Sequence, residues 1–116
     1  MGIITVYGIK ACDTMKKARS WLEANGVDYS FHDYKAQGVT PERLAVWIAQ
    51  VGWEKVLNRN GTTFRKLAED DRADLTAEKA IRLMVANPSM IKRPIIESEG
   101  ALVLGFNPSD YQKAFC

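Results

Sequence analysis

The order of hydrophobic patterns in the first 34 residues is the feature that most restricts the fold. Residues 3–7 alternate as a strand does, residues 12–25 carry apolar side chains at helical spacing, and residues 29–34 alternate again. Gly26 follows the predicted helix, where a glycine commonly ends one. A helix of this length between two strands is typical of a crossover that joins parallel strands. The pattern therefore predicts an α/β fold that begins with a βαβ unit.

The next fifty residues are predicted to be helical. Thr40 and Thr76 each precede an apolar stripe of helical period, at the position where an N-cap is expected. A turn at Asn60-Gly61 is followed by Thr62-Thr63, which we interpret as a capping pair for a short helix. The sequence thus predicts a helical insertion at about residues 38–90.

The last part of the chain has the pattern of a hairpin and a helix. Apolar residues at Ile95-Ile96 and Ala101–Leu104 flank a turn around Glu99-Gly100, and a final helix is predicted to start at Asn107-Pro108. Linkers, repeats and low-complexity segments are absent from the sequence. We therefore expect one domain over residues 1–116, a βαβ part and a ββα part around a mixed sheet.

Composition excludes several classes of protein. A net charge of +2 from 16 basic and 14 acidic residues does not indicate nucleic-acid binding, and two cysteines with one histidine do not form a zinc ligand set. No apolar run approaches the roughly 20 residues of a membrane helix, and the N-terminus lacks the pattern of a secretion signal. We expect a cytoplasmic monomer without a metal, a tightly bound cofactor, a membrane span or a nucleic-acid partner.

Cys12 is the candidate nucleophile. In "YGIKACDTMKKARSWL" (residues 7–22) it stands where the first strand passes into the helix. The free amides of Thr14 and Met15 and the helix dipole favour the thiolate there, whereas the carboxylate of Asp13 disfavours it. The structural alternative is a buried, inert thiol, because free cysteines are often buried. The local sequence leaves the balance open.

A second thiol does not stand one turn after Cys12. A dithiol redox motif would be Cys-x-x-Cys, and Met15 occupies the position of its second cysteine. A disulfide on Cys12 would have to be resolved by an external thiol or by Cys116. We interpret Cys116 as functionless, because it lies at the chain end beside the terminal carboxylate. The sole histidine, His32, lies in an alternating strand and is interpreted as structural.

Three segments in order carry a family resemblance. The opening "YGIKACDTMKKARSWLEANGVDYSFHDYK" (residues 7–35), "NRNGTTFRKL" (58–67) and "IKRPII" (91–96) resemble the arsenate reductase (ArsC)/Spx family, and closely its YffB-like branch of small bacterial proteins. The resemblance covers residues 5–115 and depends on the combination of segments. It implies a thioredoxin-like fold with a helical subdomain inserted between the βαβ and ββα parts.

The resemblance also implies roles for four residues. The cysteine matching Cys12 is the nucleophile, arginines matching Arg59 and Arg93 hold an oxyanion, and glutathione with glutaredoxin resolves the adduct. Pro94 matches the cis-proline of thioredoxin-like proteins, which faces the cysteine and aligns thiol substrates. The planar fork of arginine also suits the carboxylates of glutathione, and Lys10 stands close enough in sequence to assist. Without the resemblance, the two arginines would be interpreted as solvated surface residues.

Two departures from the family pattern bear on the substrate. Arsenate reductases of this type carry a histidine where this chain has Gly8, and a third arginine where "LGFNPSD" (residues 104–110) has no basic residue. Both departures weaken the positive clamp for arsenate. We therefore predict a glutathione-dependent thiol reductase that forms mixed disulfides, an oxidoreductase with glutathione as co-substrate and glutaredoxin as a candidate partner. The alternatives are an arsenate reductase coupled to glutathione and glutaredoxin, and a non-enzymatic Spx-like regulator that binds RNA polymerase.

Overall fold

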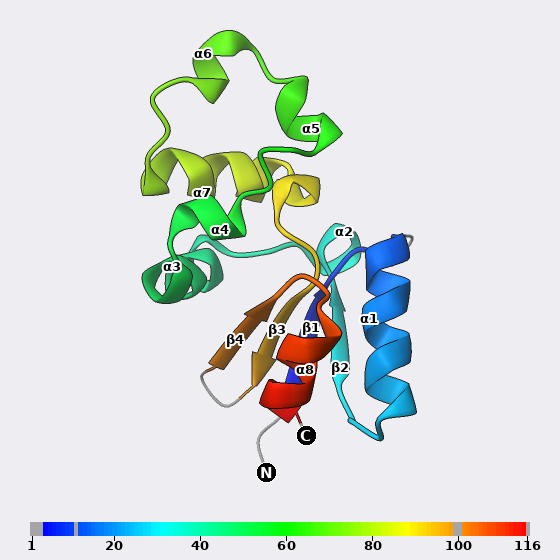
Figure 1. The fold of residues 1–116 in the computed structure, drawn as a ribbon. Coiled ribbons are helices and arrows are strands. Elements are labelled where there is room, and N and C mark those ends of the chain that lie inside the picture. The colour runs from blue at the N-terminus through cyan, green and yellow to red at the C-terminus, as the bar shows by residue number, and fades with distance from the viewer. Residues whose placement is uncertain (1–3, 11, 99–100, 116) are drawn as a thin grey trace. The chain divides into compact units, whose positions relative to one another are not determined.

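The computed structural model describes residues 4–10, 12–98 and 101–115 of the chain. These residues form a four-stranded sheet and a set of helices, joined by loops (Figure 1). The strands and the two helices next to them are β1 (Ile4–Gly8), α1 (Asp13–Ala24), β2 (Ser30–Asp33), β3 (Ile95–Ser98), β4 (Ala101–Leu104) and α8 (Pro108–Phe115). Between β2 and β3 lie α2 (Tyr34–Gln37), α3 (Pro41–Val51), α4 (Trp53–Val56), α5 (Thr62–Arg65), α6 (Glu69–Arg72), α7 (Ala77–Ala86) and the 3-10 turn η1 (Pro88–Met90).

The chain divides into two compact units, residues 1–34 with 93–116 and residues 35–92. The first unit holds the sheet, in the order β2-β1-β3-β4. β1 pairs in parallel with β2, and β3 pairs antiparallel with both β1 and β4. The predicted α/β class is confirmed, a βαβ part and a ββα part around a mixed, thioredoxin-like sheet. The single domain and its insertion at about 38–90 stay predictions.

The core of the first unit lies between one face of the sheet and the helices α1 and α8. Val6 and Ile96 are opposite each other in register, so their side chains leave the same face of the sheet. Both are fully buried against apolar side chains of the two helices; the cluster is Val6, Met15, Ala18, Leu22, Ile96 and Tyr111. Each large apolar side chain buried here contributes about 1.5–3 kcal/mol to folding, which fixes α1 and the residue before it on the sheet.

Helix ends largely follow the sequence. The predicted N-caps are confirmed, because the amide of Arg43 donates to Thr40 and the amide of Lys79 donates to Thr76, each at 3.2 Å. Gly26 has a φ of 69°, as expected of a glycine that ends a helix. The capping role of Thr62-Thr63 is wrong, because both threonines lie inside α5.

The real N-cap of α5 is Gly61, which has no side chain to accept a hydrogen bond. The hydroxyl of Thr63 lies instead 3.0 Å from the hydroxyl of Ser89, so it links α5 to η1.

The second unit contains elements that the sequence patterns did not predict. Its helix α3 packs against α4 and α7, and α2, α4, α6 and η1 each have only three or four residues. Tyr34 was predicted to end the second strand, but β2 ends at Asp33 and Tyr34 begins α2. The hairpin turn predicted at Glu99-Gly100 lies outside the described residues. Over those residues, no helix is both long and apolar enough to cross a bilayer.

Candidate active site

Cys12 lies at the junction of β1 and α1, as predicted. It is the N-cap residue of α1, with an extended backbone (φ −138°, ψ 130°) and a carbonyl that accepts from the amide of Lys16 at 3.0 Å. The residue is half-buried and its side chain packs against the core cluster of the first unit. A thiol at this position is held by a rigid helix start while part of the residue remains exposed.

The predicted hydrogen bonds to the thiol are wrong. No amide of the first turn of α1 donates to the Cys12 side chain, so Thr14 and Met15 do not cap it. Cys12 is partly buried and packs against the core cluster of the first unit. Any activation of the thiol therefore comes from the dipole of α1 and from nearby charges.

Met15 and Gly8 are packed together beside the thiol. Met15 is fully buried one turn after Cys12, where a second cysteine would complete a dithiol motif. A Cβ atom built on Gly8 would lie 2.3 Å from Sδ and 2.5 Å from Cε of Met15, well inside van der Waals contact. Gly8, which replaces the histidine of arsenate reductases, and Met15, which occupies the position of a second cysteine, are thus one packing unit. A glycine inside a strand is a sequence signal for such a close approach, but it does not name the partner.

Strand register brings the Pro94 segment to the same end of the sheet as Cys12. Tyr7, the penultimate residue of β1, is opposite Ile95, the first residue of β3. Pro94 therefore precedes β3 at the end where β1 leaves toward Cys12. The Arg93-Pro94 peptide bond is cis, as the resemblance implied, and the amide of Gly105 donates to the carbonyl of Pro94 at 2.8 Å.

Arg93 is half-buried, and its charge acts on a buried tyrosine. Burial raises the pKa of the Tyr34 hydroxyl well above its usual value, Tyr7 adds to the rise, and the positive charge of Arg93 opposes it. Tyr7 in turn donates to Oε1 of Glu97 at 2.7 Å. Arg93 is therefore close enough to Tyr34 for its charge to act on that buried hydroxyl.

The other predicted binding residues are exposed. Lys10 lies between β1 and Cys12 in the first unit, and Arg59 belongs to the second unit, where its guanidinium lies 5.6 Å from the centroid of the Trp53 ring. Cys12, Lys10, Arg93 and Pro94 share the first unit. Cys116 lies outside the described residues. No group of three metal-ligating side chains occurs in the part of the chain that the structure describes.

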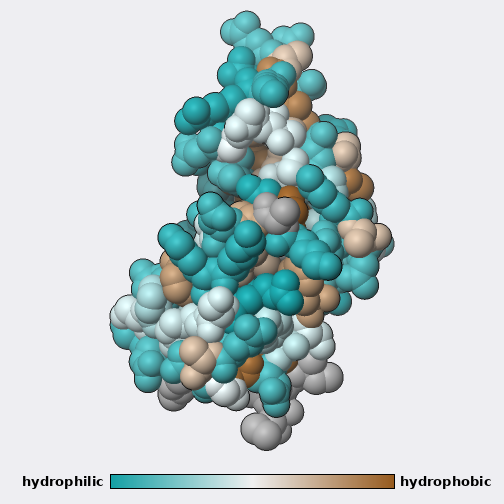
Figure 2. All heavy atoms as spheres, turned by 90° about the vertical axis from the view of Figure 1, so that its right-hand side faces the viewer, coloured by the Kyte–Doolittle hydropathy of each residue, from teal (hydrophilic) through white to brown (hydrophobic). Residues whose placement is uncertain are grey.

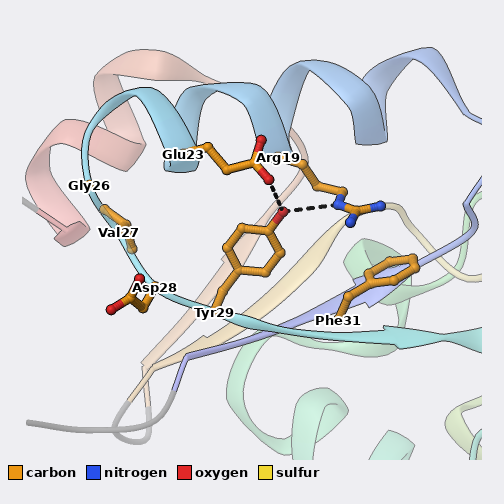
Figure 3. A pocket seen from close by; sticks show the side chains of 7 residues that line it. All are labelled: Arg19, Glu23, Gly26, Val27, Asp28, Tyr29 and Phe31. Carbon is orange, nitrogen blue, oxygen red and sulfur yellow. Dashed lines mark hydrogen bonds between the residues drawn. The ribbon is translucent and has the colours of Figure 1, made fainter.

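Two cavities flank α1, and the sequence analysis identified neither. One, of about 460 Å³, lies at the C-terminal half of the helix, remote in sequence from Cys12 (Figure 3). Its Arg19 lies 4.5 Å above the centroid of the Phe31 ring and donates to the hydroxyl of Tyr29 at 3.0 Å.

The other cavity, of about 470 Å³, begins one turn after Cys12 and is lined by Lys16, Lys17, Ser20, Trp21 and Phe106. Trp21 and Phe106 are partly buried and pack against the core cluster of the first unit.

Residues 7–114 match the model of the ArsC family. The chain belongs to the ArsC family. An uncharacterised protein of Haemophilus influenzae is 42% identical over 97% of this chain and 99% of its own. The solved structure of a YffB protein (PA3664) has a TM-score of 0.95 and 57% identity, over 97% of this chain and 99% of that one. A global transcriptional regulator, Spx 2 of Bacillus anthracis, is 26% identical over 96% of this chain and 86% of its own.

Membership of the ArsC family agrees with the position of Cys12. The family match includes the end of β1, the start of α1, the cis Arg93-Pro94 bond and the helices of the second unit. It thus includes every residue that the sequence analysis selected for the site. The family match does not by itself say what these residues bind.

Proposed function

We propose that this ArsC-family chain is a cytoplasmic, glutathione-dependent thiol reductase with Cys12 as its single nucleophile. The observation that carries the proposal is the combination of Cys12 at the start of α1 with a fully buried Met15 one turn later. Helix starts are common positions for nucleophilic cysteines, and Met15 leaves no second thiol one turn away to resolve a disulfide on Cys12. A reductase built in this way requires a second thiol from solution.

The reaction consists of two thiol–disulfide exchanges. The Cys12 thiolate attacks the glutathione sulfur of a disulfide R–S–SG, forms a mixed disulfide between Cys12 and glutathione, and releases RS⁻, which takes a proton from water. The thiolate of a second glutathione then attacks the glutathionyl sulfur, which restores the Cys12 thiolate and releases oxidised glutathione. The substrate disulfide gains two electrons, and two glutathione units leave as one disulfide.

The remaining site residues hold the glutathione. Each glutathione has two carboxylates, which suit the guanidinium groups of Arg93 and Arg59 and the ammonium group of Lys10. Pro94, at the end of the sheet toward which β1 leaves for Cys12, would align the backbone of the thiol partner. Glutaredoxin is a candidate donor of the second thiol. Arg93→Ala is expected to raise KM for glutathione more than kcat falls.

The deciding experiment follows oxidised glutathione formed from cysteine–glutathione disulfide and reduced glutathione. We expect turnover by the chain and by Cys116→Ser, and a loss of at least about a hundredfold for Cys12→Ser. Mass spectrometry should find one glutathionyl group on Cys12 during turnover. A Cys12 that stays unmodified by oxidised glutathione, in a protein that does not turn over, would refute the proposal.

Arsenate reduction is less favoured than thiol reduction as the function of this chain. At position 8 the ArsC resemblance implies a histidine in arsenate reductases, and Met15 fills the space that any side chain there would need. Arsenate, glutathione and glutaredoxin together should therefore give no arsenate-dependent oxidation of glutathione. Turnover in that assay would make arsenate reduction the better assignment.

A regulator is the second candidate, and the 26% identity to an Spx protein is the observation that favours it. Spx-like regulation would be independent of the thiol here, because Met15 leaves no Cys-x-x-Cys switch. Binding of purified RNA polymerase, equal for the chain and for Cys12→Ser, together with an inactive thiol in the turnover assay would support this candidate over the reductase.

A further inference from the structure

The cavity next to Cys12 is a groove with an aromatic floor and a basic rim. We define it by its lining residues and call it the α1 groove: Lys16, Lys17, Ser20, Trp21 and Phe106. Trp21 and Phe106 are both partly buried, and each forms a T-shaped ring pair with Tyr111, at centroid distances of 5.4 Å and 5.3 Å. The fully buried Tyr111 thus holds the two rings in place, so the apolar surface that they offer is preorganised.

The α1 groove lies beside the thiol. Positions 12, 16 and 20 follow one face of α1, so Lys16 is one turn, or about 6 Å, beyond Cys12 along the helix axis. Phe106 follows β4, whose last residue Leu104 is opposite Ile95 at the end of the sheet where Cys12 lies. A molecule whose sulfur is attacked by Cys12 can therefore extend directly into the groove.

Positive charge surrounds this end of the helix. Lys10, Lys16 and Lys17 are all exposed, and none of their ammonium groups has a hydrogen bond or an ion pair in the described part of the chain. Asp13, exposed in the first turn of α1, adds one negative charge next to these three lysines. Hydrophilic residues cover most of the side of the molecule that carries α1 (Figure 2). The unpaired lysines make the rim complementary to an acidic ligand.

We propose that the α1 groove binds an acidic peptide segment with one large apolar side chain, from the protein whose disulfide Cys12 reduces. The inference rests on the proposed function, and it names the substrate class as protein–glutathione disulfides. The apolar side chain stacks on Trp21 and Phe106 while carboxylates pair with Lys16 and Lys17. An extended segment advances about 3.3 Å per residue, so the apolar residue stands two to four positions from the substrate cysteine.

Glutathionylated peptides test this proposal with the full chain. One peptide has two glutamates next to its cysteine and a phenylalanine three residues away; a second replaces the glutamates by lysines, and a third replaces only the phenylalanine by serine. We expect kcat/KM for the first to exceed that for each of the others by about tenfold or more. The preference over the lysine peptide should shrink at high salt, because salt screens exposed charges.

Charge reversal at the rim supplies the matched comparison. Lys16→Glu/Lys17→Glu should abolish the preference for the acidic peptide, whereas Lys55→Glu/Lys66→Glu, the same change in net charge at exposed lysines that do not line the groove, should retain it. The preference is measured within each variant, as the ratio of kcat/KM for the acidic peptide to that for the lysine peptide, because charge reversal one turn from Cys12 changes the reactivity of the thiol toward both peptides alike. Equal rates on all three peptides, or a preference that survives at the reversed rim, would overturn the proposal. Failure of the proposed function is distinct, because the parent chain would then not turn over cysteine–glutathione disulfide.

Discussion

At the scale of single residues, Gly8 and Met15 determine each other. We expect Gly8→Ala to lower the free energy of unfolding by about 1–3 kcal/mol, because the new methyl group overlaps with the buried Met15 side chain and forces it to repack. Met15→Ala should cost about 2–5 kcal/mol through the cavity that it leaves. Urea unfolding of both variants and of the double variant measures the coupling.

The double variant Gly8→Ala/Met15→Ala should be more stable than the sum of the two single losses predicts, because an alanine at position 15 leaves room for the methyl group at position 8. Strict additivity would mean that the two residues do not compete for the same space.

Two buried tyrosines should respond in opposite ways to the loss of their hydroxyl groups. The hydroxyl of Tyr111 donates to the carbonyl of Gly105 at 2.7 Å, so Tyr111→Phe should cost about 1 kcal/mol. The hydroxyl of Tyr34 is buried and has no hydrogen-bond partner among the described residues, so Tyr34→Phe should raise stability by about 1 kcal/mol. Chemical unfolding of the two variants makes the comparison, and a loss of stability in Tyr34→Phe would show that its hydroxyl is satisfied in solution.

At the scale of elements, the helix starts in the second unit depend on two threonines. Thr40→Ala and Thr76→Ala should each destabilise the protein by about 1 kcal/mol, since each removes the acceptor of a cap hydrogen bond. Thr62→Ala is the matched control, because Thr62 lies in the first turn of α5 without capping it. Its effect should stay within about 0.5 kcal/mol, and a larger loss would restore the capping role that the sequence suggested.

Helices and strands were predictable where a hydrophobic period or a capping residue marks them. Alternation identified the first two strands, and apolar residues on either side of a turn identified the last two. Thr40, Thr76 and Gly26 marked helix ends correctly, because these residues act on their own neighbours in sequence. The helices α2, α4 and α6 have four residues each, which is too short for a 3.6-residue period to show. Tertiary packing decides whether such segments are helical.

The site was predictable only in part, for the same reason. The strand-to-helix junction located Cys12, and family resemblance supplied Arg59, Arg93 and Pro94, whose roles stay predictions. The contact between Gly8 and Met15 and the α1 groove depend on how side chains from separate elements meet. A glycine inside a strand signals a close approach, but no local pattern in the sequence names the side chain that fills the space.

At the scale of the whole molecule, the protein should lose stability in alkali. The pKa values of Tyr34 and Tyr111 are raised by burial above the ordinary value near 10, so above about pH 10 the unfolded chain releases these protons while the folded chain retains them. Stability that is fully present below pH 10 therefore falls as the pH rises, by about 1.4 kcal/mol per pH unit for each tyrosine.

Urea unfolding between about pH 9 and pH 11.5 measures this decline. Tyr111→Phe removes one of the two groups, so its stability should fall less steeply by about 1.4 kcal/mol per pH unit. Parallel curves for the variant and the parent chain would show that Tyr111 ionises alike in the folded and unfolded states.

The sheet also sets the order in which the chain can fold during synthesis. β1 is made first and is central in the sheet, yet its neighbour β3 begins at residue 95, so Ile4 pairs with a residue 94 positions later. Residues 35–92 form a unit that is continuous in sequence and can pack as soon as they leave the ribosome. The segment that carries Cys12 has to wait for the last quarter of the chain. The thiol is therefore present in a nascent protein well before the sheet that positions it.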